Sequence, residues 1–596
     1  MKKLLPVSRF EHRTLPAILE SVAREHGDRV FLRWIDPAAP KAPPVEITFA
    51  GFAEGVARGA AFLRRAGVGA GDRILVFAEN SPEWQYLSLG AQALRAEPAA
   101  VFASLAPEQV QAIALRVRAR VIFAATRAHW EKLRPVAAGL AEAGLRAVVC
   151  AEPLEPVALP AGVDSVLLAD AVGASAAPLP AGELARLASA VGPEDPFLLL
   201  FTSGTTGRPK GVRLPQRSIV SAIDGGAGAC GTTVRDVGVH FLPFAHVAGH
   251  DHFFLALAQA HGLAMIGRKD DIDRALALRP TYLFSVPLVY DRIRLKAQEK
   301  LNALPGPLSR LATAAVAAAA RVRVDGSRAP SDRLLRPVAD LLVGRAIRRA
   351  LGGGVRALYS GGAPAAPVLF RFFEGLGIPF IELYGMTETA GLISSNLLDG
   401  HRSPGAVGLV PPDHELRLAA DGELLLRGPL MLSGYLEPED GEGAWTADGY
   451  FRTGDLARQD ADGTLHIDGR KKALMVLSTG KKLAPEPVEQ ALAAAEPFEG
   501  AVLLGDGRPF VAAAVFVSQA ELGRLAAEGR DAAEALLERA RAALGGFAEF
   551  ERPKRLLVIP GSPQDHPALI TPTLKIRRDA VQRYLGAALG TLWERT

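Results

Sequence analysis

The chain has 596 residues, 49% of them hydrophobic, which is more than one ordinary core accommodates, so at least two domains are expected. The net charge is +4, from 68 Lys and Arg against 64 Asp and Glu, which excludes a charge-driven nucleic-acid binder but suits anionic substrates or an acidic membrane face. Two cysteines, Cys150 and Cys230, exclude a disulfide framework or a multi-cysteine metal site.

Apolar strands and amphipathic helices alternate through the N-terminal two thirds. Strands are expected at 73–78, 99–102, 120–124 and 146–150. A helix is expected from Ser81, because serine is a good N-cap and the following proline is tolerated in a first turn. This alternation is typical of parallel sheets covered by helices and predicts an α/β fold.

Residues 296–349 are mostly helical in pattern, with an alanine-rich middle and several arginines. Apolar residues at helical spacing beside charged ones predict a solvated helical hairpin that packs on the main body.

The chain becomes more charged after Asp468, and its elements become shorter. We expect a strand pair within 502–517, helix over 520–544 and a strand at 555–560. The sequence therefore predicts a large α/β body over 1–468 and a small mobile α+β domain over 469–596.

No run approaches the roughly 20 apolar residues of a membrane-spanning helix. The first residues begin like a signal peptide but have no apolar core segment. The protein is therefore expected to be cytoplasmic, with membrane association and a homodimer left open.

The segment from Thr202 to Lys210 follows a short apolar strand and reads Thr-Ser-Gly-Thr-Thr-Gly-Arg-Pro-Lys. Its glycines let backbone N–H groups approach an anion, its hydroxyls donate hydrogen bonds and its lysine neutralises charge. It is not the common phosphate loop, which places Lys and Ser/Thr directly after the second glycine. A plain surface hairpin is disfavoured, since two to five turn residues would suffice. The predicted anion-binding residues are Thr202, Ser203, Gly204, Thr205, Thr206, Gly207 and Lys210.

Two later segments each combine a short strand with a glycine turn: 358–364 and 381–389. Such turns at the carboxyl ends of strands form a ligand crevice in an open α/β sheet. Tyr384 could stack on a purine, and Thr387 and Glu388 offer the oxygen ligands that Mg²⁺ prefers. The expected contacts from these turns are Gly362, Ala363, Pro364, Tyr384, Gly385, Met386 and Thr387.

Three charged residues lie further along. Asp455, on a tight turn, could accept both hydroxyls of a ribose, and Arg470 is a natural phosphate or ribose partner. Lys575 follows a proline turn and is flanked by Leu574 and Ile576, which would hold it on a defined loop.

Five strings, TSGTTGRPKG (202–211), GGAP (361–364), YGMTET (384–389), FRTGDL (451–456) and TPTLKIRR (571–578), occur in this order. Together they resemble the motifs of the adenylate-forming superfamily of acyl- and aryl-CoA synthetases, adenylation domains and luciferases. The resemblance implies catalytic roles for Lys575, Glu388, Thr202 and Lys210, with Mg²⁺ bound through Glu388 and Thr202.

Within that superfamily, the details resemble the long-chain fatty acyl-CoA synthetases. Phe241–His246 looks like their acyl-pocket motif, so His246 is the expected substrate contact, and 469–485 looks like their hinge segment, with Lys472 at the pivot. The bulky pair that usually follows the histidine is replaced here by 247–250, and the acid after the hinge lysines is Ala473, which leaves acyl-chain preference open.

The three histidines at 246, 250 and 252 also allow a zinc site to be considered, because residues four apart share a helix face. Zinc would need a third ligand and an open geometry, so we favour a pocket and packing role.

The reaction that the resemblance implies converts ATP, a long-chain carboxylate and coenzyme A to acyl-CoA, AMP and pyrophosphate. Two alternatives remain open: an acyl-AMP ligase that hands the acyl group to a carrier protein, and a non-catalytic lipid- or nucleotide-binding descendant.

Overall fold

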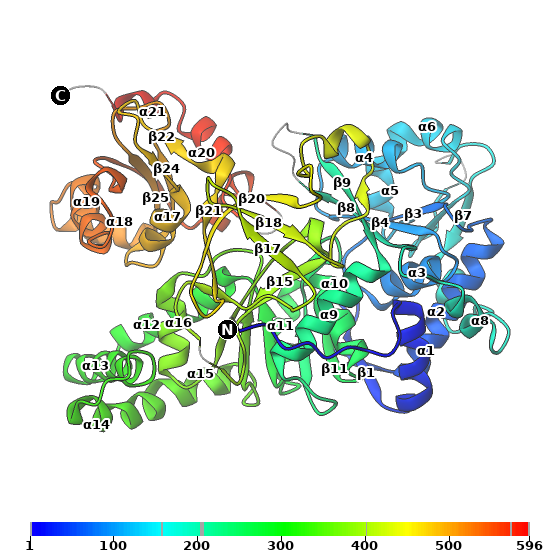
Figure 1. Cartoon of the computed structure of the whole chain (residues 1–596), viewed down its shortest axis with the longest axis horizontal. Helices are drawn as coiled ribbons and strands as arrows, with labels where there is room; N and C mark the ends of the chain where they lie inside the picture. Colours follow the sequence, from blue (N-terminus) through cyan, green and yellow to red (C-terminus); the bar gives the residue numbers. More distant parts are fainter. Residues whose placement is uncertain (1–2, 156–158, 203–207, 401, 572–574, 594–596) are drawn as a thin grey trace.

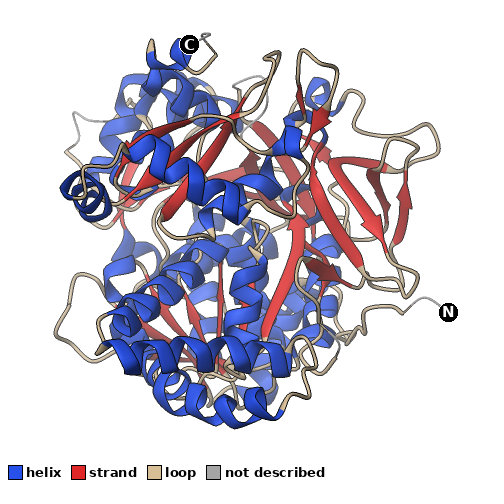
Figure 2. Cartoon of the chain, turned by 90° about the vertical axis from the view of Figure 1, so that its left-hand side faces the viewer, coloured by secondary structure: helices blue, strands red, loops and turns tan. Residues whose placement is uncertain are grey.

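A computed structural model describes the chain except residues 1–2, 156–158, 203–207, 401, 572–574 and 594–596. Figure 1 shows a large body and, at the upper left, a smaller C-terminal unit. Sheets and helices are layered in the body, as Figure 2 shows from the side.

The first eight-stranded sheet has the order β15-β14-β13-β12-β10-β11-β1-β2. Its six central strands run parallel, and β15 and β2 close the edges antiparallel. The central strands are mostly buried, as expected for a sheet covered on both faces. The bounds are β1 (Val30–Ile35), β2 (Val45–Thr48), β10 (Val237–His240), β11 (Gly262–Ile266), β12 (Tyr282–Ser285), β13 (Ala357–Ser360), β14 (Phe380–Met386) and β15 (Gly391–Ser395).

The second eight-stranded sheet has the order β19-β9-β8-β4-β3-β5-β6-β7. Strands β8 to β7 are parallel, and β9 turns back against β8. The four strands expected from the sequence are confirmed here as β3 to β6. The bounds are β3 (Arg73–Phe77), β4 (Glu97–Val101), β5 (Val121–Ala124), β6 (Ala147–Cys150), β7 (Asp164–Leu167), β8 (Pro196–Thr202), β9 (Lys210–Pro215) and β19 (Gly434–Tyr435).

Helices between the two sheets share one large apolar core with both. One of them, α3, is capped by Ser81, whose hydroxyl accepts a hydrogen bond from the Trp84 N–H at 3.2 Å, so the predicted helix start is confirmed. Both cysteines are buried. These inner helices are α1 (Leu15–His26), α2 (Phe49–Arg65), α3 (Pro82–Ala93), α9 (Gln216–Cys230) and α10 (Val247–Ala258).

The outer faces of the sheets have separate cores. Helices on the second sheet's side are α4 (Pro107–Val117), α5 (Arg127–Leu133) and α6 (Ala137–Glu142). Helices α7 (Leu168–Val172) and α8 (Glu183–Ser189) pack instead against α2 and α1 and belong to the central core. Helices on the first sheet's side are α11 (Ile272–Leu276), α12 (Pro287–Asn302), α13 (Gly306–Arg323), α14 (Pro330–Ala339), α15 (Arg345–Ala350) and α16 (Pro367–Gly375).

The helical hairpin expected within 296–349 is present, because α13 packs against α14 and also against α16 of the body. Figure 1 shows α13 and α14 at the lower left, at the periphery of the body. A π-helical turn, η4 (Asp340–Gly344), joins α14 to α15, so residues 330–350 form one continuous helical run.

A five-stranded antiparallel sheet lies between the body's core and the C-terminal unit in Figure 1. The aspartate-rich turn between its last two strands is a tight hairpin: the Gly463 N–H donates to the Asp460 carbonyl at 3.0 Å. The bounds are β16 (Ala406–Gly408), β17 (Glu415–Leu418), β18 (Glu423–Arg427), β20 (Phe451–Gln459) and β21 (Leu465–Arg470).

Elements after Arg470 pack in two cores of their own. The expected strand pair is β24 and β25, and 520–544 forms two helices where one continuous segment was expected. The bounds are β22 (Met475–Val476), β23 (Lys482–Leu483), α17 (Pro485–Ala493), β24 (Phe498–Leu504), β25 (Ala512–Val517), α18 (Gln519–Ala527), α19 (Ala532–Ala543), β26 (Leu556–Pro560), α20 (Arg578–Leu585) and α21 (Ala588–Thr591). We propose the domain boundary close to the expected 468/469: β21 extends the five-stranded sheet to Arg470, and the change of core follows directly after it.

Candidate active site

The predicted phosphate loop lies between two paired strands. Thr202 ends β8 and pairs with Lys210, which begins β9. The strand pairing is therefore that of a hairpin, the connection that the sequence analysis disfavoured, although its loop from 203 to 209 is longer than an ordinary hairpin turn. Five predicted residues, Ser203, Gly204, Thr205, Thr206 and Gly207, lie outside the described residues.

Tyr435 connects the two charged residues of this side of the site. The Lys210 ammonium lies 5.2 Å from the centre of the Tyr435 ring, and the Tyr435 hydroxyl donates to Glu388 Oε1 at 3.3 Å. Tyr435 is placed there because β19 pairs with β9. Burial raises the pKa of Glu388, and the Arg470 charge acts against that rise. A cation, a carboxylate and the end of the loop therefore share one location.

The base of the loop is fixed by a second contact that the sequence analysis missed. Arg116 and Arg208 both pair with the Glu437 carboxylate, and Arg116 also donates to the Pro209 carbonyl at 2.8 Å. The Lys210 ammonium donates to the Asp440 carbonyl. No local motif marks these contacts, because the partners lie 93 to 321 residues apart along the chain.

The two glycine turns follow neighbouring parallel strands, β13 and β14, at their carboxyl ends. Gly362 has a φ of +79°, a conformation that favours glycine. A Cβ on Gly385 would lie 1.6 Å from the Gly391 carbonyl oxygen, so only glycine fits there. The predicted contacts 362–364 and 384–387 therefore border one edge of the sheet.

Asp455 lies between two of the predicted nucleotide contacts. Its Oδ2 accepts from the Tyr384 hydroxyl at 2.5 Å, and its Oδ1 pairs with Arg470 Nε at 2.7 Å. The side chain of Asp455 is 3% exposed, and burial raises its pKa despite the Arg470 charge. Each carboxylate oxygen accepts more than one hydrogen bond, so both contacts are compatible with a ribose diol.

Lys575 of the C-terminal unit lies near enough to Asp455 and Arg470 for their charges to affect it. Ile570 and Ile576 form an antiparallel bridge on either side of it, and the Lys575 backbone N–H donates to Thr571 Oγ1 at 3.0 Å. The Lys575 side chain keeps exposed surface, yet partial desolvation and then the Arg470 charge lower its pKa, while Asp455 acts in the opposite direction.

His246, the predicted contact of the acyl substrate, is near enough to Lys575 to be affected by its charge. It caps α10, with Nδ1 accepting from the Ala248 N–H at 3.2 Å. Burial, followed by the nearby Lys575 ammonium, lowers the pKa of His246 to about 4, so the ring is neutral at physiological pH. The structure thus brings Lys575, Asp455, Arg470 and His246 together from four separate segments.

The zinc alternative is not supported. The described part of the chain holds no group of three His, Cys, Asp or Glu residues arranged for a metal. His250 Nε2 contacts the Phe244 carbonyl at 2.7 Å, and His252 contacts His240 and Tyr282. These histidines have the packing role that was favoured.

Two buried carboxyl groups near the site are without hydrogen-bond partners at one oxygen, Glu382 Oε1 and Asp251 Oδ1. Glu382 lies on β14 two residues before Tyr384, and burial raises its pKa to about 8. Asp251 lies on α10 against Gly391, and burial raises its pKa as well. Glu382 was missed, although an acid within the apolar run 380–383 was a visible signal.

The proposed hinge lies at the end of the five-stranded sheet. Lys472 is exposed in the 3₁₀ turn η7 (Lys471–Ala473). Its neighbour Lys471 pairs with Asp421 at 2.6 Å and with Glu423 at 2.9 Å. Lys471 is therefore anchored on the body, and the chain leaves the body at the next residue.

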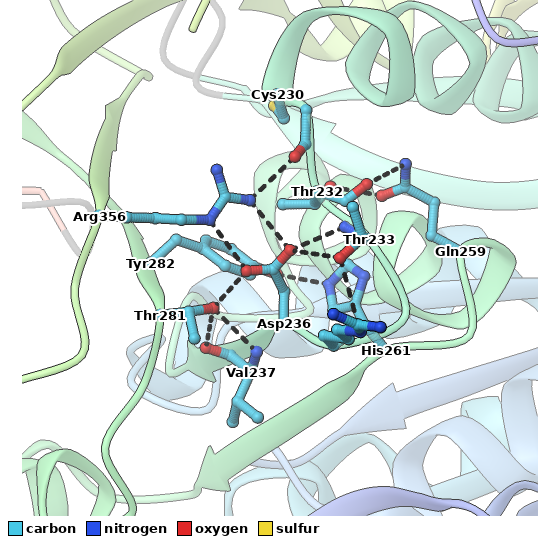
Figure 3. A network of polar contacts seen from close by, with 12 residues as sticks. Cys230, Thr232, Thr233, Asp236, Val237, Gln259, His261, Thr281, Tyr282 and Arg356 are labelled. Atoms are coloured by element: carbon cyan, nitrogen blue, oxygen red, sulfur yellow. Dashed lines mark hydrogen bonds and ion pairs between the residues drawn. The ribbon is translucent and has the colours of Figure 1, made fainter.

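A polar network holds the opposite, amino-terminal ends of β10, β12 and β13 in place (Figure 3). Arg356 pairs with Asp236 at 2.9 Å, and Thr281 Oγ1 donates to Asp236 Oδ1 at 2.6 Å. Burial alone would raise the pKa of Asp236, but these hydrogen bonds hold it below its usual value. The network fixes the strands whose other ends carry the site.

Comparisons with known proteins agree with this geometry. A family model described as AMP-binding enzyme matches residues 19–436, and one described as AMP-binding enzyme C-terminal domain matches residues 472–592. The chain belongs to the AMP-binding enzyme family.

Among the relatives of this AMP-binding enzyme is the long-chain-fatty-acid–CoA ligase FadD15 of Mycobacterium bovis, 32% identical over 622 residues, covering 99% of this chain and 98% of that protein. The long-chain-fatty-acid–CoA ligase heimdall of Drosophila melanogaster is 30% identical, with coverages of 84% and 75%. The superfamily resemblance is confirmed.

Solved structures share the fold. The adenylation domain of a carboxylate reductase from Mycobacterium chelonae has a TM-score of 0.75 at 20% identity, covering 97% of this chain and 91% of that one. ATP-bound MatB from Rhodopseudomonas palustris has a TM-score of 0.69 at 22% identity, with coverages of 97% and 99%. The α/β body with a smaller C-terminal domain is thereby confirmed.

Among the helices that the structure describes, none combines the length and apolarity needed to cross a bilayer.

Proposed function

We propose that this AMP-binding enzyme activates a long-chain fatty acid with ATP and transfers the acyl group to coenzyme A. The main supporting observation is electrostatic: the Lys575 ammonium lies near enough to Asp455 and Arg470, which are paired residues of the five-stranded sheet, and to His246 for their charges to influence one another. Near-full-length relatives named long-chain-fatty-acid–CoA ligase support the substrate class.

In the first half-reaction, a carboxylate oxygen of the fatty acid attacks the α-phosphorus of ATP, and the bond to pyrophosphate breaks. Lys575 would bridge the carboxylate and the α-phosphate, so its positive charge acts where negative charge develops. Neutral His246 would border the carboxylate without adding charge. Thr202, Lys210 and the segment between them would hold the leaving pyrophosphate.

The nucleoside would lie over the two glycine turns. Asp455 would accept from the ribose hydroxyls, with Arg470 keeping that carboxylate ionised. Tyr384 would stack on the base, and the unpartnered oxygen of Glu382 would accept from an exocyclic amino group at that edge. A buried oxygen without a partner gains most from such a ligand.

The residues present fit Mg²⁺. Glu388 supplies a carboxylate and Thr202 a hydroxyl, the hard oxygen donors that this ion takes alongside phosphate. When bound, Mg²⁺ would neutralise charge on the triphosphate. Tyr435 would hold the Glu388 carboxylate in place through its 3.3 Å hydrogen bond.

In the second half-reaction, the thiol sulfur of coenzyme A attacks the acyl carbonyl of the acyl-adenylate, and AMP leaves. Lys575 is not needed for this step. We propose that the C-terminal domain rotates about Lys472, which withdraws Lys575 and opens a path for the thiol.

A panel of carboxylates from acetate to long-chain acids tests this function, with pyrophosphate release measured with and without coenzyme A. Acid-dependent release with acyl-CoA formed in equal amount is expected for long chains. Release without any thioester would favour transfer to a carrier protein, an outcome consistent with the shared fold of a carboxylate reductase adenylation domain. No release with any acid would leave only the non-catalytic alternative.

A further inference from the structure

The helical hairpin and its extension, residues 306–350, carry a concentrated positive charge. The segment contains nine arginines and three aspartates, with no lysine and no glutamate. The whole chain has a net charge of +4, so the rest of the molecule is net negative. The net positive charge of the whole chain therefore comes from this segment.

The three aspartates of this segment pair with two of its arginines and with one arginine of α16. Asp332 pairs with Arg321 at 2.7 Å, Asp340 with Arg323 at 3.0 Å, and Asp325 with Arg371 of α16 at 2.6 Å. Within the part of the chain that the structure describes, no ion pair involves the exposed residues Arg310, Arg328, Arg333, Arg336, Arg345 and Arg349.

The same helices expose leucine side chains. On the outer run 330–350, Leu334 is 76% exposed, Leu341 57% and Leu342 36%. Leu308 and Leu311 at the start of α13 are 39% and 43% exposed. Single exposed leucines are ordinary, but here five of the exposed large hydrophobic side chains in the described chain lie within one peripheral segment.

A hollow of about 390 Å³ lies at the turn between α13 and α14. Its lining is Val322, Gly326, Ser327, Arg328, Arg333 and Arg336. Three guanidinium groups around one depression suit a phosphate, because arginine binds phosphate oxygens with paired donors.

We propose that residues 306–350 bind the surface of an anionic lipid bilayer. The leucines would enter the interface while the arginines pair with lipid phosphates, which is how basic amphipathic helices bind membranes. Nucleic acid would account for the arginines but leave the leucines exposed to water. Helix α12 begins at Pro287, two residues after β12 ends, and packs against α13, so it connects this surface to the strands that carry the site.

Sedimentation with vesicles tests the proposal. Phosphatidylcholine vesicles are compared with vesicles in which about one third of the lipid is phosphatidylglycerol. The protein is expected to bind the anionic vesicles, to bind less as salt rises, and to bind neutral vesicles weakly. Equal binding to both would overturn the proposal.

Matched variants locate the surface. Arg333→Gln with Arg345→Gln should weaken anionic-vesicle binding by at least about tenfold, whereas Arg146→Gln with Arg541→Gln, also exposed and elsewhere, should change it little. Leu334→Ser with Leu341→Ser should weaken binding as well. The proposal is contradicted if the control pair loses as much vesicle binding as the test pair. It is also contradicted if the leucine pair binds vesicles normally and the protein binds RNA through these arginines. Unchanged melting temperatures confirm that each variant is folded.

A label gives a second, independent measurement. Both native cysteines are buried, so Leu341→Cys can carry a polarity-sensitive dye selectively, with Leu115→Cys, 37% exposed on α4, as the control. A blue shift of the dye at 341 on anionic vesicles, absent at 115, is expected. No shift at 341 would overturn the placement. Neither measurement depends on the proposed catalytic activity.

Discussion

The nucleotide side of the site and the lysine that faces it are held in different ways. Tyr384, Asp455 and Arg470 are joined by hydrogen bonds of 2.5 and 2.7 Å, and Asp455 and Arg470 are paired residues of one sheet. Among the described residues, Lys575 is bonded through its backbone to Thr571 of its own segment, and it influences the body through charge.

This difference separates binding from catalysis. Residues fixed by sheet pairing can bind ATP whatever the orientation of the C-terminal domain. A lysine on a separate unit can instead be present at the site for one step and absent for the next. Four variants test this contrast, from the largest expected effect to the smallest.

Lys575→Ala should have the largest effect. Removing the charge that meets the α-phosphate should slow adenylation by about 10²–10³-fold, measured as acid-dependent pyrophosphate release. Thioester formation from supplied acyl-adenylate should be retained, because the second step does not use this lysine. Equal loss of both half-reactions would show that Lys575 serves structure only; Arg577→Gln on the same loop is the matched control.

Lys472→Pro should give the reverse pattern. Proline fixes φ and removes an N–H, so a locked pivot should slow thioester formation by about tenfold or more while adenylation continues. The measurement is acyl-CoA formed from supplied acyl-adenylate. If both half-reactions proceed at the wild-type rate, the pivot lies elsewhere.

Asp455→Asn tests the fixed side. An amide cannot pair with Arg470 as the carboxylate does, and loss of a charged hydrogen bond costs about 1.5–3 kcal/mol. The Kd for ATP should rise by about tenfold or more. The rate of acyl-adenylate formation at saturating ATP should fall far less than in Lys575→Ala. Unchanged ATP affinity in equilibrium binding would remove Asp455 from the nucleotide contacts.

Glu382→Gln should have the smallest effect on turnover and a visible effect on stability. The native pKa of about 8 lies above the usual value, so the folded state binds the proton more tightly than the unfolded state. The associated stability is present below the unfolded pKa and is lost as pH rises toward 8. By pH 7 the loss is about 3 kcal/mol. Melting curves should therefore show the variant above wild type at pH 8 and equal to it at pH 4.

Local sequence patterns predicted the elements well. Strands 73–77 and 121–124, the helix that Ser81 caps, and the glycine turns at 362 and 385 follow from apolar runs, capping and conformational freedom, which act over a few residues. The hairpin pairing around Thr202 and Lys210 was not predicted. The argument compared the number of loop residues with the length of an ordinary hairpin turn, and loop length does not show which strands pair.

The sequence by itself determined the family, the order of the motifs and the types of residue at the site, since these depend on short strings that carry their own chemistry. Tertiary structure alone decided that Tyr435 joins Lys210 to Glu388, that Glu437 fixes the end of the loop, and that Asp455 is already paired with Arg470. It also decided that the exposed arginines and leucines of 306–350 share one peripheral element. Contacts between segments hundreds of residues apart depend on how the sheets pair and pack, which no local pattern encodes.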